Sequence, residues 1–126
     1  MSEDITLTFP ARTRNVRLAR TVAAAMAAQA DLPIDQLEDV RLAVDEAVSQ
    51  LVLGSVDEEP ITCTFALVDD GLTVTVRGRT RDGEVPSTET FSWTVLTALV
   101  DSVDATAQDR VVTLTLRVGR HVAVGA

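Results

Sequence analysis

Residues 35–54, DQLEDVRLAVDEAVSQLVLG, determine the fold, because they form the pattern of one complete helix with two different faces. Asp35 is a favourable N-cap, Glu38 follows as in a capping box, and Gly54 is a favourable stop. At about 3.6 residues per turn, one side of this helix is continuously apolar. That stripe consists of Leu37, Val40, Val44, Ala47, Val48 and Leu51. It predicts a helix packed against a hydrophobic core.

A second face of the same helix mixes polar and apolar side chains. It consists of Asp39, Ala43, Glu46 and Gln50, flanked by Leu42 and Leu53. A carboxylate and an amide one turn apart, on a face that is still partly apolar, indicate the floor of a cleft. Glu46 and Gln50 are therefore the first candidates for functional residues.

Around this helix, the period of the apolar residues changes several times. Strands are expected at residues 5–9, 61–68, 72–77 and 110–118, with a further short strand possible at 103–106. Pro10 places the first strand at a sheet edge, and Asp69-Asp70-Gly71 predicts a hairpin turn. The other helices are expected at residues 14–30 and 91–103, and residues 78–90 form a loop.

The first of these helices is rich in alanine. Thr13 is its expected N-cap, and its inner face is expected to carry Leu18, Val22, Ala25 and Met26.

The whole chain, residues 1–126, is expected to form one domain. Its fold class is α+β: a two-layer sandwich with three helices on one face of a mixed, mainly antiparallel sheet of four to five strands. The other sheet face is left to solvent or to a second subunit.

Composition excludes several classes of function. The formal net charge is −8, so direct binding to nucleic acid is not expected. No apolar run reaches the roughly 18 residues that span a membrane, and the N-terminal MSEDITLTF lacks a basic segment, which predicts a cytoplasmic protein. Cys63 is the single cysteine, in a strand-like run, where a buried and unreactive thiol is expected. His121 is the single histidine, so no histidine-based catalytic or metal site is indicated.

Several segments together resemble a known family. Leu7-x-Phe9, Asn15, Ala19-Arg20 and the run 41–48, RLAVDEAV, resemble the RsbW-type anti-sigma factors, which belong to the GHKL superfamily of ATP-binding folds. Residues 91–99, FSWTVLTAL, resemble an actinobacterial branch that restrains sigma-F-like factors. The resemblance covers nearly the whole chain. It implies a histidine-kinase-like ATPase fold and a homodimer formed through the sheet and the first helix.

The resemblance also implies roles for the polar pair on the central helix. The glutamate that matches Glu46 is the general base for a serine hydroxyl on an anti-anti-sigma partner. The asparagine that matches Gln50 binds the magnesium that bridges the ATP phosphates. Glutamine keeps the amide oxygen but moves it by one methylene, whereas magnesium requires ligands at about 2.0–2.1 Å in near-octahedral geometry. This change weakens the expected metal site.

Other nucleotide positions also differ from the family pattern. The aspartate that recognises adenine aligns with Gly78, and the two glycines of the lid align with Thr90 and Ser92. Side chains at the lid hinder the close approach of backbone to phosphate that glycine permits. Thr113 aligns with a threonine that supports the phosphate site. ATP and magnesium are therefore expected to bind weakly or not at all.

The residues expected to bind protein partners match the family pattern better than the nucleotide-site residues do. Arg20 matches an arginine that contacts both the sigma factor and the STAS-type anti-anti-sigma protein, and Arg17 extends that exposed surface. A simple surface salt bridge of Arg20 is the alternative reading.

Three functions stay open. The first is an anti-sigma factor that sequesters its target by binding and is released by an antagonist. The second is an active Mg·ATP-dependent serine kinase with Glu46 as base and Gln50 as metal ligand. The third is an orphan interaction module of the same fold.

Overall fold

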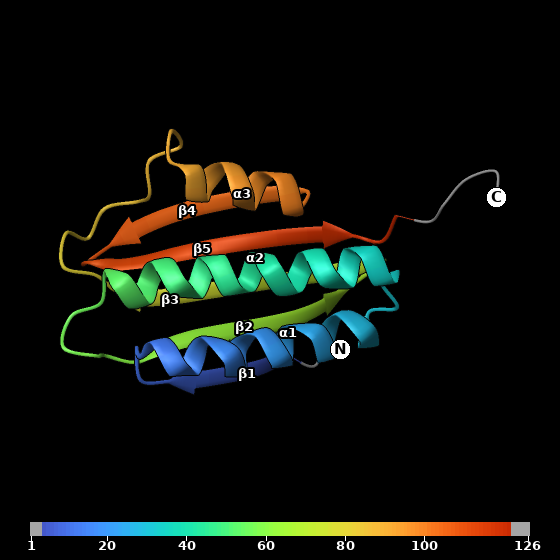
Figure 1. Cartoon of the computed structure of the whole chain (residues 1–126), viewed down its shortest axis with the longest axis horizontal. Coiled ribbons are helices and arrows are strands. Elements are labelled where there is room, and N and C mark those ends of the chain that lie inside the picture. Colours follow the sequence, from blue (N-terminus) through green and yellow to red (C-terminus); the bar gives the residue numbers. More distant parts are fainter. Residues whose placement is uncertain (1–3, 122–126) are drawn as a thin grey trace.

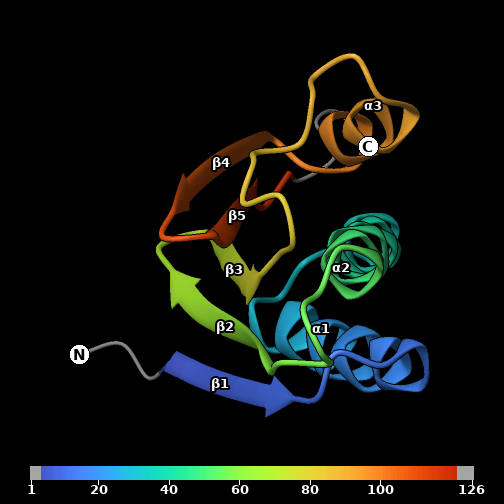
Figure 2. The same ribbon diagram turned by 90° about the vertical axis from the view of Figure 1, so that its left-hand side faces the viewer.

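The structure is a computed structural model that describes residues 4–121. Within this range, helices and strands form two layers, with the helices on one face of a single sheet (Figures 1 and 2). The elements are β1 (Asp4–Phe9), a 3₁₀ turn (Thr13–Asn15), α1 (Val16–Gln29), α2 (Ile34–Leu53), β2 (Ile61–Val68), β3 (Gly71–Arg79), α3 (Phe91–Leu99), β4 (Ser102–Gln108) and β5 (Val111–Gly119). The expected two-layer α+β architecture is confirmed.

The five strands are ordered β1-β2-β3-β5-β4. Every neighbouring pair in this sheet is antiparallel, so the expectation of a mixed sheet was wrong. The hairpin at residues 69–71 and the edge position of β1 are confirmed. The strand expected at residues 103–106 is longer than expected and becomes β4, the opposite edge.

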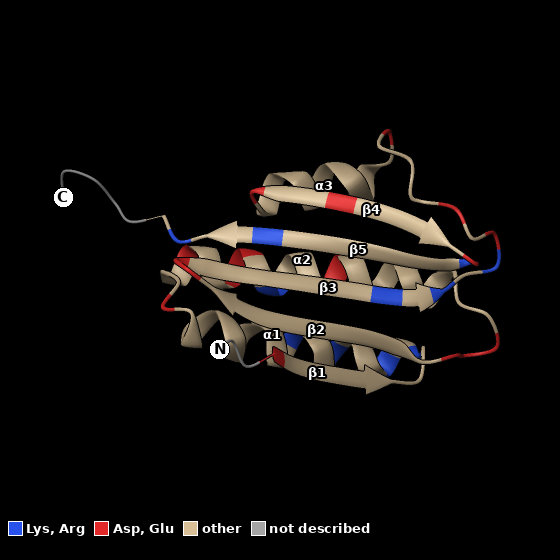
Figure 3. Ribbon diagram, turned by 180° about the vertical axis from the view of Figure 1, so that it is seen from behind, with Lys and Arg blue, Asp and Glu red and all other residues tan. Residues whose placement is uncertain are grey.

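Side chains alternate across the sheet and define its two faces. The face under the helices is apolar, and its largest buried side chains are Ile61, Phe65, Leu72, Val74, Val76, Val112, Leu114 and Leu116. The opposite face carries threonines in register across neighbouring strands, such as Thr64, Thr75 and Thr115. Figure 3 shows this solvent face with few charged positions. Side-chain alternation therefore separates a dry core from a hydroxyl-rich outer surface.

The central helix, α2, buries the stripe that the sequence predicts, including Val40, Val44 and Leu51. Its start differs from the prediction. The helix begins at Ile34, with Pro33 as N-cap and no side-chain capping bond, so Asp35 lies inside the first turn. Glu38 pairs with Arg41 at 2.6 Å and takes no part in a capping box. Gly54 does follow the helix, with a φ of −91°.

Helix α1 is rotated from its predicted orientation. The buried residues are Val16, Ala19, Ala23, Met26 and Ala27, whereas Leu18 is 53% exposed. The alanine side allows the helix to lie close to α2 and the sheet, and this close packing outweighs the burial of one leucine. Thr13 begins the 3₁₀ turn and is not the cap of α1.

Helix α3 ends at Leu99, earlier than predicted, because Val100 is extended with a φ of −131° and the chain then enters β4. β-branched residues at this boundary favour the strand. Thr90 caps the helix by accepting a bond from the Trp93 backbone N–H. Of the helices in residues 4–121, none is both long and apolar enough to cross a bilayer.

Candidate functional site

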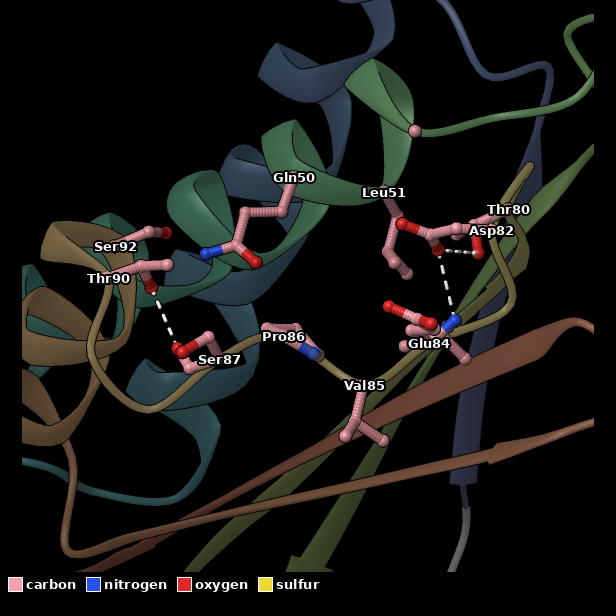
Figure 4. Close-up of a pocket in the computed structure, with 12 residues that line it drawn as sticks. Gln50, Leu51, Thr80, Asp82, Glu84, Val85, Pro86, Ser87, Thr90 and Ser92 are labelled. Carbon is pink, nitrogen blue, oxygen red and sulfur yellow. Dashed lines mark hydrogen bonds between the residues drawn. The ribbon is translucent and has the colours of Figure 1, made fainter.

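A cavity of about 380 Å³ lies between the C-terminal half of α2, the loop after β3 and the start of α3 (Figure 4). Helix α2 contributes Gln50, Leu51 and Gly54. The loop contributes Thr80, Asp82, Glu84, Val85, Pro86 and Ser87, and the start of α3 contributes Thr90 and Ser92. The structure thus brings together Gln50 and Ser92, two of the candidates that are far apart in the sequence.

Glu46 lies beside this cavity and is engaged by the chain itself. The Ser92 hydroxyl donates a hydrogen bond of 2.6 Å to Glu46 Oε2. Ser92 is in the first turn of α3, which the Thr90 cap fixes, so the bond holds α3 against α2. A hydroxyl bound to a carboxylate is the geometry of a general base with its nucleophile. Here the hydroxyl belongs to this chain and engages one of the two carboxylate oxygens, Oε2.

Gln50 points its amide toward the cavity (Figure 4). Its Nε2 atom is buried and has no hydrogen-bond partner among the described residues. An unpaired buried N–H group costs about 1–3 kcal/mol. Residues 4–121 also contain no group of three or more His, Cys, Asp or Glu side chains placed to hold a metal ion. The Gln50 amide lines the same cavity as two carboxylates, those of Asp82 and Glu84.

The loop after β3 forms an acidic wall that the sequence did not indicate. Thr80 is buried at 6% exposure, and its hydroxyl donates to Asp82 Oδ1 at 3.3 Å while accepting from the Gly83 N–H at 3.0 Å. Asp82 also accepts from the Glu84 N–H at 3.0 Å. Gly83 has a φ of +63°, which suits glycine. The Asp82-Gly83 turn was the available signal, but it indicates only a loop.

Two predicted nucleotide positions lie outside the cavity. Gly78 faces the core, where an added Cβ would be 3.1 Å from Ile61 Cγ1 and 3.7 Å from Leu51 Cδ1. Thr113 pairs with Arg77 in the sheet register and lies on the solvent face, opposite the helices. Strand alternation explains this placement, since the neighbouring Val112 is the residue that lines the cavity.

Arg20 forms the salt bridge that was the alternative reading for this residue. Its Nη1 lies 3.0 Å from Asp45 Oδ2, and both side chains are about one-third exposed, at 37% and 31%. Arg14, Arg17 and Arg20 line a shallow depression between the 3₁₀ turn, α1 and α2. We call these three arginines the basic face. Arg14 and Arg17 have no ion-pair partner within the part of the chain that the structure describes.

Comparisons of this chain with family models and with known proteins agree on one family. The model of the histidine kinase-like ATPase domain matches residues 9–117. The anti-sigma-F factor RsbW of Mycobacterium tuberculosis is 32% identical over 99 residues, which is 79% of this chain and 59% of that protein. The chain thus spans a little over half the length of that relative. An anti-sigma F factor of Heyndrickxia coagulans is 28% identical and is covered almost entirely, with 98% of this chain and 96% of that protein aligned.

A solved structure supports the same fold. The crystal structure of the RsbU and RsbW domains of a Mycobacterium tuberculosis protein superposes with a TM-score of 0.75 at 20% identity, covering 96% of this chain and 34% of that chain. The family match covers most of the chain, and the fold agrees with it. The chain therefore belongs to the histidine kinase-like ATPase domain family and is similar within it to the RsbW anti-sigma factors.

Proposed function

We propose that this chain is an anti-sigma factor that acts in the cytoplasm by protein binding. It sequesters an alternative sigma factor through the basic face and releases it when a STAS-type anti-anti-sigma protein competes. The similarity to proteins named anti-sigma-F factors, over 79% of the chain, supports the class of partner. The hydrogen bond from Ser92 to Glu46 is the observation that favours binding over catalysis.

The cavity residues do not fit Mg·ATP. Asp82 and Glu84 line the cavity, and none of its lining side chains is a lysine or arginine to offset the phosphate charge. Two carboxylates close to a triphosphate are repulsive in a partly desolvated site. Glutamine at position 50 moves the amide oxygen by one methylene from where the family's asparagine places it, which displaces the expected magnesium ligand. We infer a degenerate nucleotide site.

The basic face supports the binding role. The chain has 19 acidic and 11 basic residues, so its net charge is negative. The depression lined by three arginines is in contrast a basic part of the surface. Arg20 is already held by Asp45, and an acidic partner group would share or replace this contact. Complementary charge raises the association rate and selects the partner more than it raises affinity. Two acidic partners that use the same arginine would exclude one another.

A homodimer is part of this proposal. The edge of the sheet at β1 is unpaired on one side, and the strand carries no charge between Ile5 and Phe9. Helix α1 lies over this side of the sheet (Figure 2), with Leu18 and Ala25 exposed along it. An uncharged open edge beside apolar side chains favours pairing with a second copy. Sedimentation equilibrium tests it: we expect a dimer that Leu18→Glu weakens at least tenfold, and a monomeric wild type would contradict the dimer.

The active-kinase alternative has one observation in its favour. The family's general base is kept as Glu46, and this residue hydrogen-bonds to Ser92, which lines the cavity. Isothermal titration with Mg·ATP separates the two functions. We expect no saturable heat. Micromolar binding that Glu46→Ala or Gln50→Ala abolishes would overturn the degenerate nucleotide site.

The sigma-binding proposal is tested by affinity capture from a lysate of the native organism. We expect the wild type to recover a sigma factor and Arg17→Ala with Arg20→Ala to recover at least tenfold less. Arg117→Ala is the matched control, because Arg117 is paired with Asp104 on the far face of the sheet. Circular dichroism shows whether each variant is folded. Recovery of other proteins but no sigma factor would favour an orphan interaction module.

A further inference from the structure

The arginines of this chain can be sorted by what they contact. Six form ion pairs within the described residues: Arg12, Arg20, Arg41, Arg79, Arg117 and Arg120. Arg81 and Arg110 donate to the backbone carbonyls of Leu53 and Arg81. Arg14, Arg17 and Arg77 have no such partner within residues 4–121. An unpartnered arginine keeps all of its N–H donors available to a group that binds from outside. Arg14 and Arg17 belong to the basic face, whereas Arg77 has no assigned role.

Arg77 lies on the solvent face of the sheet, on the side opposite α2. Its register partners are Thr62 on β2 and Thr113 on β5, and Thr113 in turn pairs with Thr106 on β4. Side chains of paired residues lie on the same face, so Arg77 is surrounded by hydroxyl groups. Figure 3 shows basic positions at the C-terminal end of β3 on this face.

A depression of about 350 Å³ contains these groups. Its polar lining consists of Arg77, Arg79, Thr106, Gln108, Asp109 and Thr113. Arg77, Arg79, Gln108 and the two threonines are all able to donate hydrogen bonds, and they come from three adjacent strands. A neighbouring depression on the same face is also lined by Arg77 and Arg79. Arg77 therefore lies at the centre of a donor-rich surface.

The acidic groups nearby leave Arg77 without an ion-pair partner within the described residues. Glu59 lies 3.4 Å from Arg79 and pairs with that residue. Asp109 is the one carboxylate that lines the depression, and it forms no ion pair with Arg77 within 4.0 Å. Glu59 and Asp109 together balance the formal charges of Arg79 and Arg77 around the depression. Arg77 is the guanidinium that keeps all of its N–H donors free of an ion pair.

We propose that the solvent face of the sheet holds a binding site for a phosphate group, centred on Arg77. A planar guanidinium donates two parallel bonds to such an oxyanion, and the threonine hydroxyls and the Gln108 amide supply donors for the remaining oxygens. The phosphate group comes either from free inorganic phosphate or from a phosphorylated side chain of a partner. The site is separate from the cavity at α2, because it lies on the other face of the sheet.

The test is a titration of the ¹⁵N-labelled protein at constant ionic strength, followed by amide chemical shifts. Inorganic phosphate and O-phosphoserine are the two probes, and glutamate is the carboxylate control. We expect saturable shifts at Thr106, Gln108 and Thr113 with one or both phosphate probes. Saturation by inorganic phosphate identifies the free ion as sufficient, and saturation by O-phosphoserine alone identifies a phosphorylated side chain.

Arg77→Gln is expected to weaken this binding at least tenfold. Arg117→Gln is the matched control, since Arg117 is on the same face but is paired with Asp104, and it is expected to change binding less than twofold. Linear shifts without saturation, or equal binding by Arg77→Gln, would overturn the site. Sigma-factor capture by Arg77→Gln is expected to equal that of the wild type, so the two proposals fail separately.

Discussion

Removal of the Ser92 hydroxyl tests whether Glu46 is engaged within the chain. The bond is short, at 2.6 Å, and partly buried, and it joins a hydroxyl to a carboxylate. Hydrogen bonds to charged groups contribute about 1.5–3 kcal/mol, and partial exposure places this one at the lower end. Ser92→Ala is therefore expected to lower the free energy of unfolding by about 1.5 kcal/mol. The expected fall in melting temperature is about 4–9 °C for a domain of this size.

A double-mutant cycle isolates the contribution of the pair. Ser92→Ala, Glu46→Ala and the double variant are unfolded in urea, and we expect a coupling energy of about 1–1.5 kcal/mol. The matched control is Ser49 with Asp45, the other serine–carboxylate contact on α2, whose atoms lie 3.5 Å apart. Its long contact predicts a coupling below about 0.5 kcal/mol. A Ser92–Glu46 coupling as weak as that expected for the control pair, below about 0.5 kcal/mol, would refute the reasoning, because Glu46 would then not be engaged by Ser92.

Three further outcomes follow from individual side chains. Gly78→Asp places a carboxyl group against Ile61 and is expected to destabilise the fold by at least about 3 kcal/mol in urea, without creating ATP affinity; a stable, ATP-binding variant would contradict this placement. Burial raises the pKa of Cys63 to about 12, so a thiol reagent should label it only after unfolding, and rapid labelling of the native protein would show that it is accessible. The Asp101 carboxylate is hydrogen-bonded to the His121 side chain and to the Gly119 N–H, and these bonds lower its pKa. The contribution of Asp101 to stability is therefore present above about pH 4 and is lost as the pH falls. Asp101→Asn should therefore reduce the melting temperature at pH 6 more than at pH 3, and an equal reduction at both would contradict the pKa direction.

The fold could be predicted where one periodicity dominates. The stripe of α2 and the alternation of β2 and β3 each have a single apolar face, so their burial follows directly from the residue types. Helix α1 is different, because alanine occurs all round it and periodicity does not select one face. Because Leu18 is one of the most hydrophobic residues of its segment, the sequence predicts it to be buried. Close packing of α1 instead requires small side chains on the buried face, and Leu18 is exposed.

The candidate site was predictable only in part. Gln50 was found from the second face of the helix and Ser92 from the family pattern, and both line one cavity. Thr113 was displaced to the other face because a shift of one residue in a strand reverses the side chain. Thr80 was missed, since its burial depends on the loop after β3 packing against the end of α2, where the Arg81 N–H donates to the Gly54 carbonyl, a contact between residues far apart in the sequence.

The most direct test of binding without nucleotide chemistry is the dissociation constant of the complex with the captured sigma factor. It is measured with 1 mM Mg·ATP and, separately, with EDTA and no nucleotide, at roughly physiological ionic strength of about 0.15 M. We predict that the two constants agree within twofold and that Arg20→Ala raises both at least tenfold. Binding that requires Mg·ATP, or that falls when ATP is removed, would contradict a protein that acts by binding alone.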